Sequence, residues 1–556
     1  MNCYISEIVL NDTTKLSVAP NDIIVFVGPN NAGKSQALKD IYTLCDGKSP
    51  TKVVKDIMVC KEEKSNIEAF ISEHSSVKTD KYGNIYQGCG YQLRKSDIES
   101  SCRKNCYANL RSVFVAYLNT DRRLEICNPP QAINSNTPYQ HPIHAVAFDP
   151  YYRNLLSDVF FKAFETKLIP HNQFGQNIPL CMGETVPPKK GCSDAQEILE
   201  DYRKTLDTYK QVQEQGDGIR SFTGILLYLI SKVHHTFLID EPESFLHPPQ
   251  AKIMGQAIGE LLGDNKQAFI STHSQEIIKG LLDVCPERVK IVRITRKEDT
   301  NYFSVLKNET YNEIWKDPLL KYSNIMDSLF HKQVVLCESD MDCKLYSIIL
   351  SHLKAKEGMY SETLFIHCGG KHRFHKVIAA LKALDIDVSA VLDIDALNDE
   401  ETIKVIYSSM GGDWDSLKKD YHILSANLVS GKSKIVRNDV KKKFEDIISK
   451  KTDKELSKNE IDSITALFKT ETKWGLLKKG GEVIIPAGDA FSSYTMLKRE
   501  FENKRIFLVP VGEIENFVKS VGGHGSEWVN KVLEMYTDLD AKELATLRSF
   551  VESWQL

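Results

Sequence analysis

The chain has 556 residues, a formal net charge of −4 at pH 7, 42% hydrophobic residues and 26% charged residues. This length predicts about three folding units, and the composition excludes disordered and fibrous proteins. The small net charge gives no general attraction to nucleic acid, so any such contact requires a local basic surface.

Thirteen cysteines are scattered through the chain without regular spacing. Cys102 and Cys106, with Cys89 upstream and Cys127 downstream, are candidate zinc ligands, but the paired C-x₂-C spacing of zinc sites is absent. Buried or inert thiols are therefore favoured. Because the N-terminus lacks a basic and then apolar leader, and no apolar stretch reaches about 18 residues, we expect a reduced cytoplasmic protein without a membrane segment.

A strand is expected over residues 3–10, and a second over residues 22–27 leads into GPNNAGKS at residues 28–35. This stretch fits G-x-x-x-x-G-K-[ST] and has the strand and helix that the pattern needs on either side. Such a loop turns backbone N–H groups toward phosphates, which the following helix N-terminus also attracts. Lys34 would reach the outer phosphates, and the Ser35 hydroxyl would coordinate Mg²⁺. The predicted nucleotide-contacting residues of the loop are Gly28, Asn30, Asn31, Gly33, Lys34 and Ser35.

Residues from about 48 to 215 contain short runs typical of strands, at 113–118 and 124–127, separated by loops rich in Pro and Asn. We interpret this region as an insertion within one domain. It ends in a polar stretch at 193–210 whose apolar residues keep helical spacing, which predicts a packing or dimerisation face.

An apolar strand at 236–240 ends in Asp240 and Glu241. In phosphate-loop ATPases, acids at this place supply a carboxylate for the Mg²⁺ shell and a second one that orients the attacking water. Asp240 is the predicted metal-shell acid and Glu241 the predicted catalytic carboxylate.

DEPESFLHP at residues 240–248 and AFISTHS at residues 268–274 resemble the ABC-type ATPase heads of DNA-repair and chromosome-maintenance proteins and of OLD (overcoming lysogenisation defect) nucleases. The resemblance implies that His273 senses the γ-phosphate. QGDGIRS at residues 215–221 resembles the signature loop that contacts ATP across a dimer interface, through Gly216, Asp217 and Gly218. Gln215 stands where this loop usually has serine, which predicts ATP binding with slow hydrolysis.

Strands expected at 332–338, before the Gly turn within 363–371, and at 387–395 alternate with helices at 343–353 and 373–384, which predicts a parallel sheet. Glu338, Asp393 and Asp395 follow or end these strands and would lie side by side. Clustered carboxylates repel one another unless a cation neutralises them, and oxygen ligands suit Mg²⁺ or Mn²⁺. A metal site is therefore predicted at this edge.

Glu338, then Gly-Gly-Lys at 369–371, then Asp393-x-Asp395 resembles a TOPRIM domain. Glu513 and Glu515 are similar to the motif that completes a second metal site in OLD-type TOPRIM domains, and Asp342 matches another acidic position of that family. The order is that of OLD proteins: an α/β chain with an ABC-type phosphate-loop ATPase domain over residues 1–330, then a TOPRIM nuclease domain over residues 331–556.

Two features do not match the family pattern. Residues from about 411 to 488 form an insertion whose Lys441, Lys442 and Lys443 would meet a phosphate backbone or lie on a solvated helix face. The family's late catalytic lysine is assigned to Lys531, with Lys519 as the alternative.

The hypothesis is an ATP-controlled nuclease in which two cations, roughly 3.5–4 Å apart, activate water and stabilise the leaving oxygen. The predicted catalytic residues are Glu241, Glu338, Asp393, Asp395 and Lys531. The predicted metal ligands are Ser35, Asp240, Glu338, Asp342, Asp393, Asp395, Glu513 and Glu515. The alternative is an ATP-binding sensor or scaffold with an inactive TOPRIM domain that controls a separate effector.

The expected cofactors are ATP and Mg²⁺ or Mn²⁺, and the expected substrate is DNA or RNA. Because the phosphate loop and signature loop of such heads serve opposite sites, a homodimer or larger even-numbered assembly is predicted. The resemblance further implies the effector of a bacterial antiphage system of Gabija or retron type. Its controlling partner would be a protein or nucleic acid, such as a reverse transcriptase with its DNA product.

Overall fold

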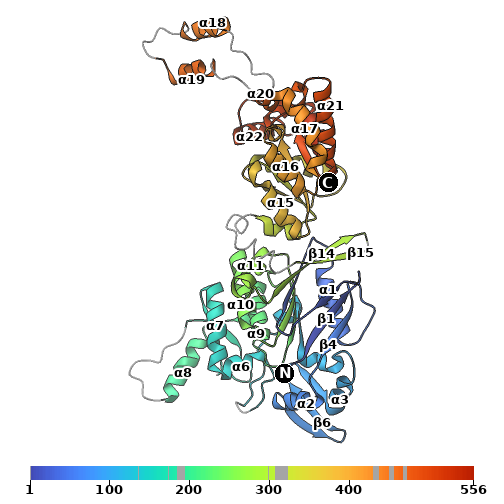
Figure 1. Cartoon of the computed structure of the whole chain (residues 1–556). Coiled ribbons are helices and arrows are strands. Elements are labelled where there is room, and N and C mark those ends of the chain that lie inside the picture. The colour runs from blue at the N-terminus through green and yellow to red at the C-terminus, as the bar shows by residue number, and fades with distance from the viewer. Residues whose placement is uncertain are drawn as a thin grey trace. The chain divides into compact units, whose positions relative to one another are not determined.

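The computed structural model describes residues 2–134, 137–172, 174–184, 195–298, 300–306, 324–429, 437–449, 456–467 and 473–555. The chain divides into two compact units, Met1–Pro318 and Leu319–Leu556. Each is described by itself below, with the element labels of Figure 1.

A six-stranded sheet forms the centre of the N-terminal unit. Its strands, in spatial order, are β15 (Thr300–Val305), β14 (Val289–Lys297), β3 (Ile23–Val27), β13 (Gln267–Ser271), β12 (Thr236–Asp240) and β8 (Val115–Leu118). β15 pairs antiparallel with β14, and the other neighbouring pairs are parallel, with Leu238 beside Phe269 and Phe269 beside Ile24. The nearly continuous apolar sequence of β3 fits this position, because all five of its residues are buried.

Figure 1 shows helices and smaller strands on the two sides of this sheet. The helices are α1 (Lys34–Cys45), α2 (Lys64–Glu73), α3 (Lys95–Cys102), α4 (Arg111–Phe114), α5 (Thr120–Glu125), α6 (Pro142–Phe148), α7 (Pro150–Phe164), α8 (Ala195–Leu206), α9 (Asp217–Leu229), α10 (Pro248–Leu261) and α11 (Gln275–Val284). Three antiparallel sheets comprise β1 (Tyr4–Leu10) with β2 (Lys15–Ser17) and β4 (Val54–Cys60), β5 (Ser76–Asp80) with β6 (Gly83–Gly88) and β7 (Tyr91–Arg94), and β9 (Lys167–Pro170) with β10 (Leu180–Gly183) and β11 (Lys210–Gln211). One hydrophobic core joins α1, β1 and β4 to a face of the central sheet.

The region expected to be an insertion supplies β8, which is an integral strand of the central sheet. The strand expected at 124–127 is wrong: these residues lie at the end of α5 and just after it. The Asn119 side chain accepts a hydrogen bond from the Arg122 backbone N–H, and this N-cap starts a helix directly after β8. The helix expected at 193–210 corresponds to α8, and residues 193 and 194 lie outside the described residues.

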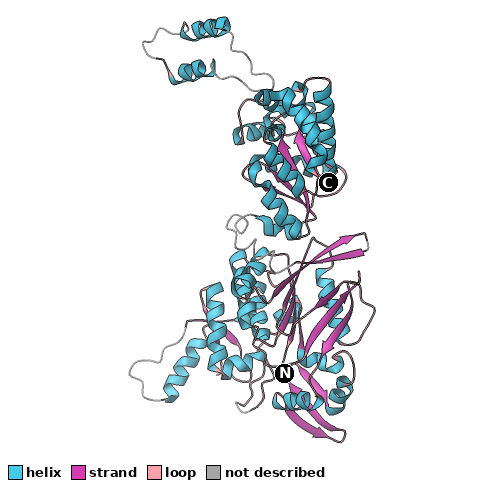
Figure 2. Ribbon diagram, in the orientation of Figure 1, coloured by secondary structure: helices cyan, strands magenta, loops and turns pink. Residues whose placement is uncertain are grey.

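The C-terminal unit contains a four-stranded, fully parallel sheet in the order β17 (Thr363–His367), β16 (Gln333–Cys337), β18 (Asp387–Asp393) and β19 (Ile506–Val509). Helices surround these strands in Figure 2. They are α14 (Asp340–Lys356), α15 (Phe374–Ala383), α16 (Glu400–Ser409), α17 (Trp414–Val429), α18 (Arg437–Ile448), α19 (Lys458–Leu467), α20 (Lys473–Gly480), α21 (Asp489–Asn503), α22 (Ser526–Met535) and α23 (Ala545–Glu552), with short 3₁₀ segments η3 (Asn324–Phe330), η5 (Ile394–Asn398) and η7 (Ile514–Val518).

The core of this unit places Val335, Val391 and Phe507 of the sheet with Tyr346 of α14 and Trp528 of α22. Parts of the expected insertion at 411–488 belong to the body of the unit, because α17 packs on α21 and α20 packs on η5. Residues 430–436, 450–455 and 468–472 of it lie outside the described residues. None of the described helices combines the length and apolar character needed to span a membrane.

Candidate functional sites

The loop after β3 borders a pocket of about 920 Å³ in the N-terminal unit. Gly28 and Gly33 have φ values of 143° and 99°, which side-chain-bearing residues rarely adopt. Gly28 also lies so close to Ile294 that a Cβ would stand 2.0 Å from the Ile294 carbonyl oxygen. These two glycines therefore set the shape of the loop, and Gly33 directly precedes α1.

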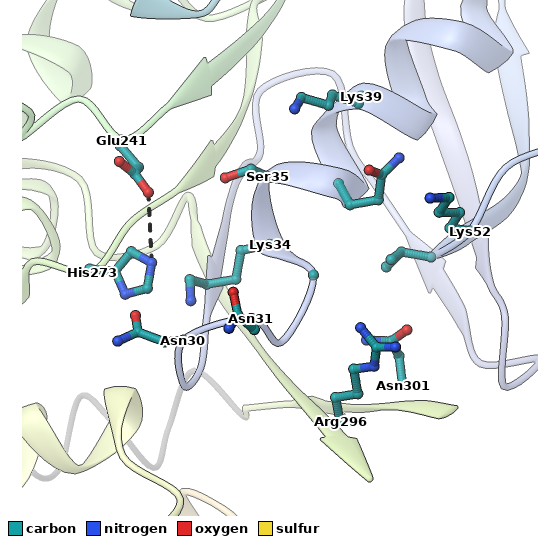
Figure 3. Close-up of a pocket in the computed structure, with 13 residues that line it drawn as sticks. Asn30, Asn31, Lys34, Ser35, Lys39, Lys52, Glu241, His273, Arg296 and Asn301 are labelled. Carbon is teal, nitrogen blue, oxygen red and sulfur yellow. Dashed lines mark ion pairs between the residues drawn. The ribbon is translucent and has the colours of Figure 1, made fainter. Parts of the chain in front are cut away.

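Lys34 projects into the centre of the pocket (Figure 3). Its ammonium donates hydrogen bonds of 2.8 Å to the carbonyl oxygens of Gly28 and Pro29. Burial lowers the pKa of Lys34 to about 8, although Glu241, Glu243 and Asp240 act in the opposite direction. The surroundings of Lys34 thus disfavour its charged form, and a phosphate group bound beside it would stabilise that form.

Glu241 and His273 lie on one side of Lys34, and Arg296 and Asn301 lie on the other (Figure 3). The distance from His273 Nε2 to Glu241 Oε1 is 3.7 Å. Burial and the nearby Lys34 lower the pKa of His273 despite the acids beside it, which favours the neutral imidazole. A neutral imidazole still donates one ring N–H hydrogen bond, which is what a γ-phosphate contact requires.

The acidic loop after β12 is held by hydrogen bonds from the neighbouring strand end. Ser271 Oγ donates to Asp240 Oδ1 at 2.5 Å, and the Glu241 N–H donates to the Ser271 carbonyl oxygen at 2.9 Å. Glu243 accepts from the His273 N–H at 2.6 Å and from the Thr272 hydroxyl at 2.9 Å. The two loops that face Lys34 are therefore fastened to each other.

In the C-terminal unit, Glu338, Asp393 and Asp395 come together at the carboxyl edge of the parallel sheet. One carboxylate oxygen of each lies within 4.8 Å of the others, and we call these residues the three-carboxylate group. Glu338 Oε1 accepts a hydrogen bond from the Asp393 N–H at 3.1 Å. Burial raises the pKa of Asp393 well above its usual value, and Glu338, Asp342 and Asp395 raise it further. Burial likewise raises the pKa of Glu338.

A second cluster at the same edge, which we call the Glu513–Glu515 group, contains Glu513, Glu515 and His524 within the same distance limit. Glu515 Oε1 accepts a hydrogen bond from the Gly525 N–H at 2.8 Å and lies 2.6 Å from His524 Nδ1. Asp342 caps α14 by accepting from the Ser339 N–H at 2.9 Å. Burial raises the pKa of Asp342, and the charge of Glu515 adds to this effect.

Comparison with known proteins identifies a family model that matches part of each unit. The family model "AAA ATPase domain" matches residues 147–278, and the model "Overcoming lysogenization defect protein-like, TOPRIM domain" matches residues 329–395. The chain joins an AAA ATPase domain to an OLD-like TOPRIM domain. This confirms the predicted resemblance to OLD-family ATPase–TOPRIM nucleases and the predicted α/β class, with a phosphate-loop ATPase first and a TOPRIM domain second.

Solved structures similar to this chain include SMC head domains. An Smc head bound to the C-terminal winged-helix domain of ScpA shares 14% identity with a TM-score of 0.34, and covers 56% of this chain and 99% of its own. An Smc head with an extended coiled coil from Pyrococcus furiosus has 12% identity, a TM-score of 0.31 and the same coverage. The SMC head from Thermotoga maritima has 12% identity and a TM-score of 0.29, covering 55% of this chain and 98% of its own. No curated protein matches the chain in sequence.

The structure places the predicted residues as follows. Within the ATPase domain, Asn30, Asn31, Gly33, Lys34, Ser35, Glu241 and His273 line the pocket, whereas Asp240 is not among the lining residues and accepts a hydrogen bond from Ser271. Gly216, Asp217 and Gly218 begin α9 and are not among the residues that line the pocket of the same chain.

Within the described residues, the predicted late lysine forms no ion pair with the carboxylates of the TOPRIM acidic edge. Lys531 is on α22 and bonds Glu527 Oε1 at 2.6 Å and the Gly522 carbonyl oxygen at 3.3 Å. Lys519 follows η7 as an exposed residue. The lysines that do contact the acidic edge are Lys371, 3.5 Å from Asp395 Oδ1, and Lys478, which the sequence interpretation did not assign. Of these two lysines, only Lys371 had a sequence signal, which was its position after Gly369 and Gly370.

Sequence reasoning also missed Arg123 in the ATPase domain. Its side chain is fully buried, and its guanidinium donates to the Glu241 carbonyl oxygen at 2.9 Å and to the Thr120 hydroxyl at 3.2 Å. A buried charge is retained only where its partners compensate the loss of hydration. Arg123 therefore fixes the backbone of the predicted catalytic Glu241, which itself has a φ of 48°.

The low pKa of Lys34 predicts a pH dependence of ATP binding. Above pH 8 most nucleotide-free molecules carry a neutral Lys34, so binding the triphosphate must take up a proton. We expect ATP affinity to fall about tenfold per pH unit above pH 8, measured by calorimetry. The Lys39→Met variant, which alters another lysine of the pocket, should keep this dependence. A constant affinity from pH 7.5 to 9.5 would contradict the assignment.

Proposed function

We propose that this chain is an ATP-regulated, divalent-metal-dependent nuclease that cleaves phosphodiester bonds in DNA or RNA. The observation that carries the proposal is the clustering of Glu338, Asp393 and Asp395 at the strand ends of an OLD-like TOPRIM domain. Three converging carboxylates supply the oxygen ligands that Mg²⁺ and Mn²⁺ prefer. A cation held there would supply Lewis-acid stabilisation of the reacting phosphate and a more acidic bound water.

The protein's own groups would prepare the site for this chemistry. The Asp393 N–H orients Glu338 through the hydrogen bond to Oε1, and Lys371 holds Asp395 from the other side. The raised pKa values of Glu338 and Asp393 show that burial disfavours their anionic forms, so a bound cation would stabilise them as ligands. Asp342, Glu513 and Glu515 complete the acidic edge. Lys531 stays a prediction for the late catalytic lysine.

We further propose the assignment of the ATP site. Gly28, Asn30, Asn31, Gly33 and Lys34 would surround the phosphates, while Ser35 and Asp240 would hold the Mg²⁺ of the nucleotide. Glu241 would orient the attacking water, and His273 would contact the γ-phosphate. The proposed functional domains are residues 1–330 and 331–556, and the protein is proposed to act in the cytoplasm.

Substitution of the acidic edge tests the nuclease assignment. Because they remove ligand charge with little change in shape, Glu338→Gln and Asp393→Asn should each lower Mg²⁺- or Mn²⁺-dependent cleavage on the order of 10³-fold or more. Plasmid, linear duplex, single-stranded DNA and tRNA should each be tested with both metals, with and without ATP. Glu534→Gln, an exposed carboxyl on α22, is the matched control.

Undiminished cleavage in both variants would refute the assignment. Biological activity that survives both substitutions but is lost in Lys34→Ala would instead favour the ATP-binding scaffold with an inactive TOPRIM domain.

ATP is proposed to bring two chains together, with Lys34 of one facing the loop at residues 216–218 of the other. Asp217 suits a test because half of its side chain is exposed at the start of α9. In a Glu241→Gln background that slows hydrolysis, light scattering at micromolar concentration should show a dimer or larger even assembly with ATP. Adding Asp217→Arg should yield monomers that still bind ATP, whereas adding Glu260→Arg, on the surface of α10, should not. A monomeric Glu241→Gln protein with saturating ATP would count against the assembly.

The biological role is proposed to be that of an antiphage effector under the control of a partner, as in Gabija- or retron-type systems. An unrestrained nuclease would damage its host, so a protein or nucleic acid, such as a reverse transcriptase with its DNA product, would govern it. The regions at 48–215 and 411–488 are the proposed docking places.

Phage challenge of cells that express this chain alone, or together with its neighbouring genes, tests partner control. We expect protection only with the neighbours, and its loss in Asp393→Asn. Full protection by the chain alone would leave a self-contained nuclease.

A further inference from the structure

Lys478 lies between the two acidic clusters of the TOPRIM domain. Its Nζ is 3.8 Å from Asp395 Oδ2, in the three-carboxylate group, and 3.6 Å from Glu513 Oε2, in the Glu513–Glu515 group. The side chain is 41% exposed, so it is accessible to solvent. One protein cation thus contacts both clusters.

The backbone that carries Lys478 is fixed to the loop that carries Glu513. The Lys478 carbonyl oxygen accepts a hydrogen bond from Asn516 Nδ2 at 3.0 Å, and a Cβ on Gly512 would stand 2.0 Å from that oxygen. Shortly after α20, the Glu482 N–H donates to the Pro510 carbonyl oxygen at 2.8 Å. These contacts hold the backbone of Lys478 beside the loop that carries Glu513, so the position of the lysine is part of the structure of the site.

The two clusters differ in how the protein satisfies their charge. In the Glu513–Glu515 group, Glu515 accepts from the Gly525 N–H and lies beside His524, and Glu513 pairs with Lys478. In the three-carboxylate group, no lysine or arginine of the described ranges forms an ion pair with Glu338 or Asp393. Glu338 and Asp393 are therefore the carboxylates of the three-carboxylate group that lack such a partner in the described ranges, whereas Asp395 pairs with Lys371 and Lys478.

We propose that the acidic edge binds one divalent cation, at the three-carboxylate group, and that the ammonium of Lys478 takes the place of a second cation between Asp395 and Glu513. This rests on the proposed metal-dependent function. An ammonium is a compact point charge that binds phosphate oxygens, so it can stabilise a reacting phosphodiester without a second metal ion.

Lys478 lies within ion-pair distance of both Asp395 and Glu513. Removal of its ammonium would leave Glu513 without its lysine partner and Asp395 with Lys371 alone. Carboxylates with less positive compensation attract a divalent ion. Lys478→Met should therefore open a second metal site rather than abolish metal binding.

Manganese binding to the full-length, nucleotide-free protein tests this directly. Asp240→Asn is included in every sample so that the ATPase domain contributes no cation. Calorimetry should give one Mn²⁺ per chain for otherwise wild-type protein, with an uncoupled electron paramagnetic resonance spectrum. Lys478→Met, and independently Lys478→Gln, should give two Mn²⁺ per chain with exchange coupling between them. Lys478→Arg, which keeps the charge, and Lys479→Met, at an exposed neighbouring lysine, should give one.

Two Mn²⁺ in the protein with native Lys478 would overturn the proposal, as would a single Mn²⁺ in both neutral variants. No Mn²⁺ at all would overturn it together with the proposed function. The pattern of one and two ions would support it even in a protein that cleaves none of the nucleic acids tested, because stoichiometry is measured without turnover.

Discussion

Parallel strand pairing is the constraint on which both candidate sites depend. In the ATPase domain, β3, β12 and β13 run in one direction, so the phosphate loop, the Asp240–Glu241 pair and His273 follow strands that end at the same edge. In the TOPRIM domain, β16, β18 and β19 do the same for the acidic residues. Parallel strands bring the residues after each of them to one edge whatever their separation in sequence. Residues more than 170 positions apart, such as Glu338 and Glu513, thereby reach one surface.

The two sites have opposite charge. At each site, burial disfavours the ionised form of the side chain that would bind the ligand. The ATPase pocket is lined by Lys34, Lys39, Lys52 and Arg296, and burial lowers the pKa of Lys34. The TOPRIM edge gathers carboxylates, and burial raises the pKa of Asp393. In each case the shift opposes the ionised form, so binding of a counter-charged ligand would stabilise the folded site. The same physical cost thus favours a polyanion at one site and a cation at the other.

Local sequence patterns allowed prediction of those parts of the sites that follow directly from neighbouring residues. The glycine-rich loop between a strand and a helix identified Lys34 as a site residue. Acids at the ends of apolar runs identified Glu241 and Glu338. Local patterns failed at residues 124–127, because β-type residues there lie at the end of a helix that the Asn119 cap begins.

Residues that act through tertiary contacts could not be found in this way. Lys478 lies in a stretch expected to be an insertion, and only the packing of α20 on η5 and on the loop at residues 510–516 brings it to the acidic edge. Arg123 gave no pattern at all, since its role depends on α5 packing between the Glu241 loop and α9. One sequence reveals helix and strand periodicity, but it does not reveal which distant charged side chain will pack beside a given group of residues.

The packing around Arg123 also constrains how the signature-like loop and Glu241 can move. α9 begins at Asp217, and its Gly224 lies so close to α5 that a Cβ would stand 2.0 Å from the Arg123 carbonyl oxygen. Arg220 of α9 donates to the Leu124 carbonyl oxygen at 3.2 Å, and the Arg123 guanidinium holds the Glu241 carbonyl oxygen. Because a buried guanidinium that loses its partner is strongly destabilising, separate movement of α5 and the Glu241 loop is disfavoured. Contact of another molecule with residues 216–218 would therefore act on the backbone of Glu241 through only one intervening helix.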